Sequence, residues 1–222
     1  MFLNVKDIDT MYMHDFEIYV DYKGQLELGK LLLGQDYFPN SLLGGITNFT
    51  LPMFPLNTDG LDIAGKDILV ERINITNYDD AVVIKSSSKT NKYAQCSSNI
   101  IVRDCIVYFG VGMTIGSVAP HDEYSCVDGV QFLNHEFHHP FKAIYVKTNP
   151  GTTTSMLPGS GGRIANILYD NIVIHKAIWW TIYIGPQQQK QPGGGGPGCM
   201  LYPLTPCETQ PLIDMHDITL SN

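Results

Sequence analysis

Three aspartates, each just before an apolar run, carry side chains that could act as acids or bases. Asp59 lies in "PLNTDGLDIAG", while Asp79 and Asp80 stand side by side in "NYDDAVVIK". Neighbouring negative charges disfavour ionisation, so crowding raises the pKa of at least one carboxyl in such a group. One protonated and one ionised carboxyl are what the hydrolysis of a glycosidic bond requires. A solvated acidic turn and a calcium site, which also uses oxygen ligands, are the alternatives that the residues leave open.

An internal repeat indicates how these aspartates are positioned. Each copy contains short runs of Ile, Val, Phe or Leu, separated by a few polar residues and without a 3.6-residue period. Four copies begin at Lys66, Asn99, Gly129 and Asn166, and a partial copy, "IDMHDITLSN", ends the chain. The residues that hold equivalent places in the four units are Ile84, Ile115, Val146 and Ile184. Such self-similarity predicts a solenoid of stacked units.

The content of each unit predicts an all-β chain folded as a right-handed parallel β-helix. Three short strands per unit, rich in β-branched residues, suit one coil of that fold. A β-sandwich would need hairpins without a repeat of roughly thirty residues, and a leucine-rich repeat would need its Leu/Asn consensus. We therefore expect residues 1–222 to form a single β-helix domain, with a Gly-, Pro- and Gln-rich loop over residues 186–206.

Stacking of the coils brings residues that are distant in sequence to within one strand spacing, about 4.8 Å. Asp59 precedes the Asp79–Asp80 pair by about one shortened coil, so we expect Asp59 one rung below the pair. The segment Gly110–Gly112 holds the matching place one coil later, and Tyr145–Lys147 comes two coils above on the same face. The repeat thus predicts three carboxylates and a lysine on one face of the β-helix.

Four ordered motifs resemble those of the polygalacturonases, glycoside hydrolase family 28. They are "NTDG" at 57–60, "DD" at 79–80, "GVGMTIGS" at 110–117 and "YVK" at 145–147. The resemblance covers roughly residues 51 to 190 and implies a pectin lyase-like solenoid. It implies a secreted, extracellular hydrolase of pectic cell-wall polysaccharides that inverts the anomeric carbon and needs no cofactor. Because family members have more coils, we expect a divergent, truncated member whose β-helix is incomplete at both ends.

The resemblance also implies a role for each site residue. Asp79 would be the general acid, and Asp59 and Asp80 would position and deprotonate the attacking water. Lys147 would bind the carboxylate of the substrate. The other residues expected to contact the substrate are Tyr145, Asn57 and Gly112.

Two positions depart from the pattern of the family. Val111 stands where the third motif has a histidine, and Tyr145 stands where the fourth motif has an arginine. A tyrosine can stack on a sugar or donate one hydrogen bond, but it lacks the charged fork of arginine. The substrate is therefore open among pectic and related acidic polysaccharides. Two other functions also stay open: a catalytically silent, carbohydrate-binding β-helix, and a calcium-dependent polysaccharide lyase on the same fold.

Composition restricts the partners. A net charge of −8 with only 14 Lys and Arg argues against nucleic acid or an anionic membrane, because both require a basic surface. No run of 18 apolar residues occurs, so no membrane-spanning helix is expected. The resemblance implies a polysaccharide as the partner, and the chain is expected to be a monomer. The N-terminal segment meets charges too early for a signal peptide, so the extracellular location is expected from the resemblance alone.

The metal-binding residue types give no clear site in the sequence. His135, His138 and His139 cluster in "NHEFHHP", but without the H-E-x-x-H spacing, so a solvated turn is predicted and no metal is expected. Five cysteines show no CxxC spacing either. Cys199 and Cys207 are close enough to close a disulfide, which would leave an odd thiol among the other three cysteines.

Overall fold

The structure, a computed structural model, describes residues 3–21, 23, 58–87, 92, 95–120, 125–148, 161–185 and 213–222. Asn57, Cys199, Cys207 and the predicted loop at 186–206 lie outside the described residues. The strands of the described residues are β1 Leu3–Tyr19, β2 Leu61–Asn77, β3 Val82–Ile84, β4 Ser97–Arg103, β5 Ile106–Phe109, β6 Met113–Val118, β7 Cys126–His138, β8 Ile144–Thr148, β9 Gly162–His175, β10 Ile182–Ile184 and β11 Ile213–Ser221.

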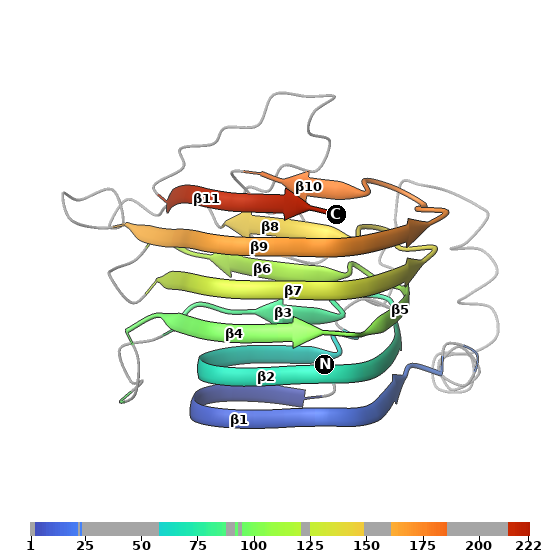
Figure 1. Cartoon of the computed structure of the whole chain (residues 1–222), viewed down its shortest axis with the longest axis horizontal. Helices are drawn as coiled ribbons and strands as arrows, with labels where there is room; N and C mark the ends of the chain where they lie inside the picture. The colour runs from blue at the N-terminus through green and yellow to red at the C-terminus, as the bar shows by residue number, and fades with distance from the viewer. Residues whose placement is uncertain are drawn as a thin grey trace, which may run out of the picture.

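The strands stack as the coils of a parallel β-helix, which confirms the predicted fold class. Every strand pair is parallel, and the pairing order is β10-β8-β6-β3-β2-β4-β7-β9-β11, with β1 on β2. Figure 1 shows the coils as successive layers, with β1 at one end of the stack and β10 and β11 at the other. One face, which we call the site face, consists of β3, β6, β8 and β10 together with the first residues of β2. No helix among the described residues is long and apolar enough to span a membrane.

The residues that the repeat predicted to be equivalent pair with one another in the strands of the site face. Ile84 pairs with Ile115, Ile115 with Val146, and Val146 with Ile184. All but Ile184 are fully buried and form part of the apolar interior of the β-helix. Fully burying one such side chain contributes roughly 1.5–3 kcal/mol, so the stacked interior is the main stabilising element of the fold.

Single residues in the left-handed conformation make the corners between the faces. One corner stacks Arg72, Asp104, Asn134 and Asn171, with φ between 53° and 57°. Asn and Asp tolerate this conformation better than other residues with a Cβ. Their side chains also join the coils, because Asn134 Nδ2 donates to Asp104 Oδ1 at 3.0 Å and Asn171 Nδ2 donates to Asn134 Oδ1 at 2.9 Å. Corners this short let β2 continue as one strand from Leu61 to Asn77.

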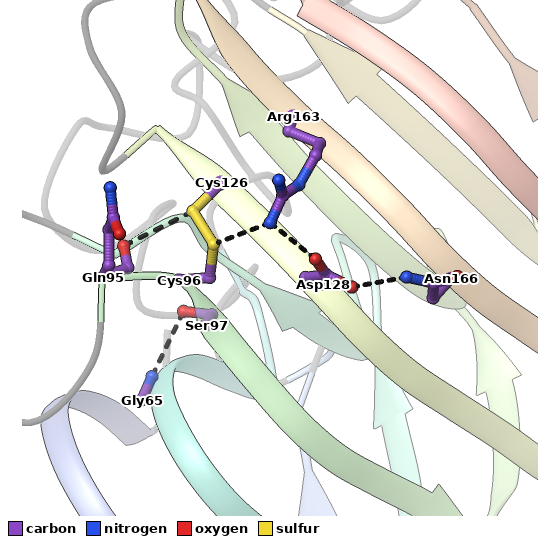
Figure 2. The surroundings of a disulfide bond; sticks show 8 residues. All are labelled: Gly65, Gln95, Cys96, Ser97, Cys126, Asp128, Arg163 and Asn166. Carbon is purple, nitrogen blue, oxygen red and sulfur yellow. Dashed lines mark hydrogen bonds and ion pairs between the residues drawn. A yellow bond between two sulfur atoms is a disulfide. The ribbon is translucent and has the colours of Figure 1, made fainter.

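A disulfide joins two neighbouring coils. Cys96 and Cys126 lie just before and at the start of the paired strands β4 and β7 and are bonded across 30 positions, as Figure 2 shows. Arg163, on the next coil, lies beside this bond and pairs with Asp128 at 2.6 Å. Cys105 is the odd thiol among the three described cysteines, and its burial raises its pKa to about 12. The predicted Cys199–Cys207 bridge stays a prediction.

Candidate active site

The three aspartates meet at the entrance to the site face. One carboxylate oxygen from each of Asp59, Asp79 and Asp80 lies within 4.8 Å of those of the other two. Gly60 N donates to Asp80 O at 2.9 Å, and Leu61 pairs with Val82, so Asp59 stands one rung from the aspartate pair. The stacking predicted from the repeat is therefore confirmed. The catalytic roles of these side chains stay predictions.

The carboxylate of Asp80 is held by two side chains from later coils. Thr114 Oγ1 on β6 donates to Asp80 Oδ1 at 2.7 Å, and Lys147 Nζ on β8 donates to Asp80 Oδ2, also at 2.7 Å. Asp80 and Lys147 are both buried. A buried carboxylate that accepts from a charged donor and from a hydroxyl donor is fixed in position by strong hydrogen bonds. Thr114 was not identified from the sequence, although its place in the third motif, one coil after Val83, could have indicated it.

Asn77 fixes the backbone that carries the aspartate pair. Its side-chain Nδ2 lies near three carbonyl oxygens, at 3.1 Å from that of Thr58 and at 2.8 Å from those of Asp79 and Asp80. Thr58 Oγ1 also accepts a hydrogen bond from the backbone N of Tyr78 at 3.1 Å. One buried amide therefore ties the Asp59 segment to the aspartate pair. Sequence reasoning missed Asn77, because an asparagine at a strand end is common in turns.

The glycines of the third motif are required by close backbone approach. Gly110 has φ 59°, and a Cβ there would lie 2.7 Å from Asp79 O. Gly112 has φ 70°, and a Cβ there would lie 2.2 Å from Ala143 O of the next coil. Between the two glycines, Val111 N donates to Asp79 O at 2.8 Å, so the motif pins the acid pair through its backbone. The prediction that Gly112 also contacts the substrate is a separate one and stays a prediction.

The electrostatics separate the carboxyls of the cluster. Burial raises the pKa of Asp59, and the nearby charges of Asp80 and Asp62 raise it further. For Lys147, burial lowers the pKa, but Asp80, Tyr145 and Asp79 together outweigh that effect and the net shift is upward. Asp80 is therefore matched to a permanent cation while Asp59 retains its proton more readily than an ordinary aspartate. Carboxyls in such different environments can take the acid and base roles of one reaction.

Tyr145 lies on the site face and not among the apolar side chains of the interior. It pairs with Thr114 in the register of β8 on β6, and the Nζ atoms of Lys142 and Lys147 lie 4.5 Å and 4.7 Å from the centroid of its ring. The ring of Tyr183, one coil further, meets it edge-on at 5.4 Å. Tyr145 is buried by these neighbours. The aromatic ring of Tyr145 thus contacts two ammonium groups.

Lys142 is a second lysine at the site, which the sequence analysis did not identify. Its neighbour Ala143 stands opposite Gly112, which places Lys142 one rung from Val111, the position of the family histidine. It is half-buried, and burial together with the charge of Lys147 lowers its pKa to about 8, although Asp80 and Asp79 act in the opposite direction. Its only sequence signal is a charged residue three positions before the fourth motif.

The clustered carboxylates could also hold a hard cation such as Ca²⁺, because three oxygen ligands converge within 4.8 Å. Lys147, however, already places a positive charge against Asp80. A cation at this place would have to stand beside that ammonium. The geometry therefore favours acid–base chemistry by the carboxyls over a calcium-dependent reaction.

Comparisons with known proteins identify relatives of this chain. Residues 45–197 match the model of the glycosyl hydrolases family 28. A polygalacturonase of Fusarium fujikuroi is 30% identical over 143 residues, which are 64% of this chain and 32% of that protein. Endopolygalacturonase D of Aspergillus niger is 31% identical over 143 residues, 64% of this chain and 24% of that protein. An exopolygalacturonase of Cochliobolus carbonum is 27% identical over 125 residues, 53% of this chain and 26% of that protein. The chain spans about a quarter to a third of the length of these relatives.

Proposed function

This chain belongs to the glycosyl hydrolases family 28, and from that premise we propose that it hydrolyses glycosidic bonds in pectic or related acidic polysaccharides. The observation that carries the proposal is the aspartate cluster, in which the Asp80 side chain is held by Lys147 and Thr114 while the pKa of Asp59 is raised. Curated relatives with the name polygalacturonase, both endo- and exo-acting, support the same class of substrate.

In the proposed reaction, Asp79 donates its proton to the oxygen of the leaving sugar as the glycosidic bond breaks. A water molecule positioned by Asp59 attacks the anomeric carbon, and its proton passes to Asp80, so that the number of protons on the cluster is unchanged. Asp80 suits the role of base because it is fixed at both carboxylate oxygens. Direct attack by water inverts the anomeric configuration.

The stereochemical outcome is itself a test. The closest oxygens of the cluster lie within 4.8 Å of one another, nearer than the separation of about 6.5–9.5 Å that leaves room for water in most inverting enzymes. We expect the first-formed product, followed by proton NMR, to have the inverted anomeric configuration. Retention would mean that one of the three aspartates is a nucleophile.

We propose that lysine side chains bind the substrate carboxylate in this chain, because Tyr145 stands where the family motif has an arginine. Lys147 is buried against Asp80, so its main proposed role is to hold that carboxylate, with any contact to a substrate carboxylate made by its remaining donors. Lys142, half-buried and one rung from Val111, is proposed to supply the more accessible positive charge. Tyr145, Gly112 and Asn57 are proposed to complete the contacts with the sugar.

The setting of the protein is proposed from the same premise. A disulfide such as Cys96–Cys126 forms and persists in oxidising compartments, which supports secretion to the extracellular space and a role in cell wall organisation. The polysaccharide is the proposed partner of a monomer. No nucleic acid or membrane is proposed to take part, in keeping with the net charge of −8.

Release of reducing ends is the experiment that tests the proposal. The purified chain is incubated with polygalacturonate, its methyl-esterified form and an acidic algal polysaccharide, with and without EDTA. We expect activity that resists EDTA and gives no unsaturated, ultraviolet-absorbing product. Asp79→Asn should lower kcat by about 10²- to 10⁴-fold, the usual contribution of general acid catalysis. Asp104→Asn, at an exposed corner position with φ 56°, is the matched control and should act as wild type.

Each other outcome identifies a different function. Activity that EDTA abolishes and that yields unsaturated products would indicate a lyase. Binding of a polysaccharide without turnover would indicate a silent carbohydrate-binding β-helix, which the departures at Val111 and Tyr145 make worth measuring. Full activity in Asp79→Asn would overturn the assignment of the general acid.

A further inference from the structure

A second group of ligand-bearing side chains lies outside the aspartate cluster, on the outer surface where β7 pairs with β9. It consists of Glu136, His138 and His175, here called the Glu136 cluster. Glu136 and His138 are two residues apart on β7, so their side chains point to the same side of the strand. His175 ends β9 and pairs in register with His138. The layers of β7 and β9 are neighbours in the stack (Figure 1).

Both histidines of the Glu136 cluster direct the same nitrogen at one carboxylate oxygen. His138 Nε2 is 3.0 Å from Glu136 Oε1, and His175 Nε2 is 3.1 Å from the same atom. The two imidazole rings are stacked, with centroids 4.9 Å apart and planes at 19°. The stacking with Tyr108 of the preceding coil, at 4.9 Å, orients the ring of His138. The strand pairing therefore converges three potential ligand atoms on one point.

This set of ligand atoms fits a transition-metal ion. Zn²⁺ binds imidazole nitrogen and carboxylate oxygen at about 2.0–2.2 Å, which separates two ligand atoms of a tetrahedral site by about 3.3 Å. The distances from Glu136 Oε1 to the two nitrogens are within a few tenths of an ångström of that value. Two neutral imidazoles and one carboxylate carry a single negative charge, which attracts a divalent cation. Imidazole ligands favour Zn²⁺, Ni²⁺ or Cu²⁺ over Ca²⁺ and Mg²⁺.

We propose that Glu136, His138 and His175 bind one divalent transition-metal ion, with Zn²⁺ as the reference ion. Water fills the remaining coordination positions, since the side chains of His138, Glu136 and His175 are 28%, 44% and 46% exposed. The ion would join two consecutive coils, because Glu136 and His175 are 39 positions apart. A metal clip that closes such a loop restricts the unfolded chain and thereby stabilises the fold. This site is independent of the proposed hydrolase activity.

The sequence analysis expected no metal site because it considered only histidines that are close together in the sequence. Of the three histidines in "NHEFHHP", His135 is buried and accepts a hydrogen bond from Cys105 N, and His139 stacks on Phe109 instead. The third ligand, His175, belongs to the next repeat. The parallel register makes the site, which no local motif encodes.

Calorimetric titration of the metal-free chain with ZnCl₂ tests the proposal. We expect one ion per chain, and at least tenfold weaker binding in His175→Ala and in Glu136→Gln. His139→Ala is the matched control, an exposed histidine next to the cluster that does not belong to it, and it should bind as wild type. Asp79→Asn should also bind as wild type, which separates this site from the aspartate cluster. Zinc should raise the Tm of wild type and of both controls and leave that of His175→Ala unchanged.

Two results would overturn the proposal. No saturable zinc binding by the wild-type chain would mean that the Glu136 cluster is an ion pair only. Equal binding by wild type, His175→Ala and Glu136→Gln would place any bound zinc elsewhere on the chain. Glu136→Gln preserves the shape of the side chain, so the test holds if His175→Ala fails to fold.

Discussion

Asp80 and Lys147 form an ion pair in which Nζ lies 2.7 Å from Oδ2 and the two side chains are only 2% and 3% exposed. The residues are 67 positions apart and reach each other across two coils. Removing one partner of a buried pair leaves an uncompensated charge, which typically costs 3–5 kcal/mol. The pair is therefore a constraint on the site, and each member depends on the other.

Lys147→Met is expected to lower both stability and activity. The free energy of unfolding should fall by about 3–5 kcal/mol because Asp80 would be left buried without its cation. Urea denaturation measures this loss, and kcat on polygalacturonate should fall by a factor of about ten or more. Lys85→Met is the matched control, because Lys85 also pairs with an aspartate at the site face, Asp62 at 3.6 Å, but is 30% exposed. Its effect should stay within about 1 kcal/mol, and equal losses in both variants would contradict the role of the buried pair.

Asp59→Asn is expected to stabilise the fold at neutral pH while it removes activity. Burial and the charge of Asp80 raise the pKa of Asp59 above the ordinary 3.8, so the folded state binds this proton more tightly than the unfolded state. Stability from this group is complete at low pH and is lost as the pH rises through the raised pKa. Asparagine avoids that loss. The gain in Tm should thus appear at pH 7 and vanish below about pH 3.

Asp128→Asn is the comparison for that measurement. Asp128 is paired with Arg163 at 2.6 Å, away from other carboxylates of the site, so its removal should give no gain in Tm at pH 7. A gain of equal size in both variants would mean that the lower net negative charge of the chain, and not the crowding at Asp59, is responsible.

Much of the fold could be predicted because its determinants are periodic. Ile84, Ile115 and Val146 recur at the same place in each unit, and the structure pairs them in that register. The rung that joins Asp59 to Asp80 followed from the same periodicity. Periodicity could not predict which side chains contact each other across more than one coil, because that depends on the length of each side chain. Lys147 extends past one coil to reach Asp80.

The disulfide and the Glu136 cluster show the same limit. Cys96 meets Cys126, and His138 meets His175, only after the coils are in register, and the segments that join successive strands differ in length. Sequence spacing alone suggested a bridge between Cys199 and Cys207, which stays a prediction, and gave no indication of the bond between Cys96 and Cys126. In a β-helix, however, the nearest neighbours in space are one coil apart, and short sequence separation is a poor guide to contact.

The double variant Cys96→Ser, Cys126→Ser is expected to be less stable than wild type by about 3–4 kcal/mol. The bond closes a loop of 30 positions, and in the chain-entropy account a loop of that size restricts the unfolded chain by about this amount. Guanidinium denaturation under non-reducing conditions measures the difference. Cys105→Ser removes a buried thiol instead, and its effect should be insensitive to reductant. Reductant should lower the midpoint of wild type by more than that of the double variant, in which only the predicted Cys199–Cys207 bridge would respond, and an unchanged wild type would contradict the bond.

Lys142 is expected to make substrate binding depend on pH. Its pKa, lowered to about 8 by burial and by the charge of Lys147, means that its ammonium is present at pH 7 and largely lost at pH 9. Loss of one charged contact to a uronate corresponds to about 1.4 kcal/mol, or tenfold in Kd. In the inactive Asp79→Asn background, we expect the Kd for a galacturonate oligosaccharide to rise by about that factor between pH 7 and pH 9. The same ligand with methyl-esterified carboxyls should show no such step.

Lys142→Met decides whether this lysine is responsible, because methionine keeps the apolar contact with Tyr145 and removes the charge. The variant should bind the charged oligosaccharide about tenfold more weakly at pH 7, with a Kd that no longer changes toward pH 9. Lys85→Met, which removes a lysine paired with Asp62, should keep the step. Tyr145→Arg should not improve binding, because an arginine there would stand beside the ammonium groups of both Lys142 and Lys147. If the Kd of Lys142→Met still rose between pH 7 and pH 9, a group other than Lys142 would bind the substrate carboxylate.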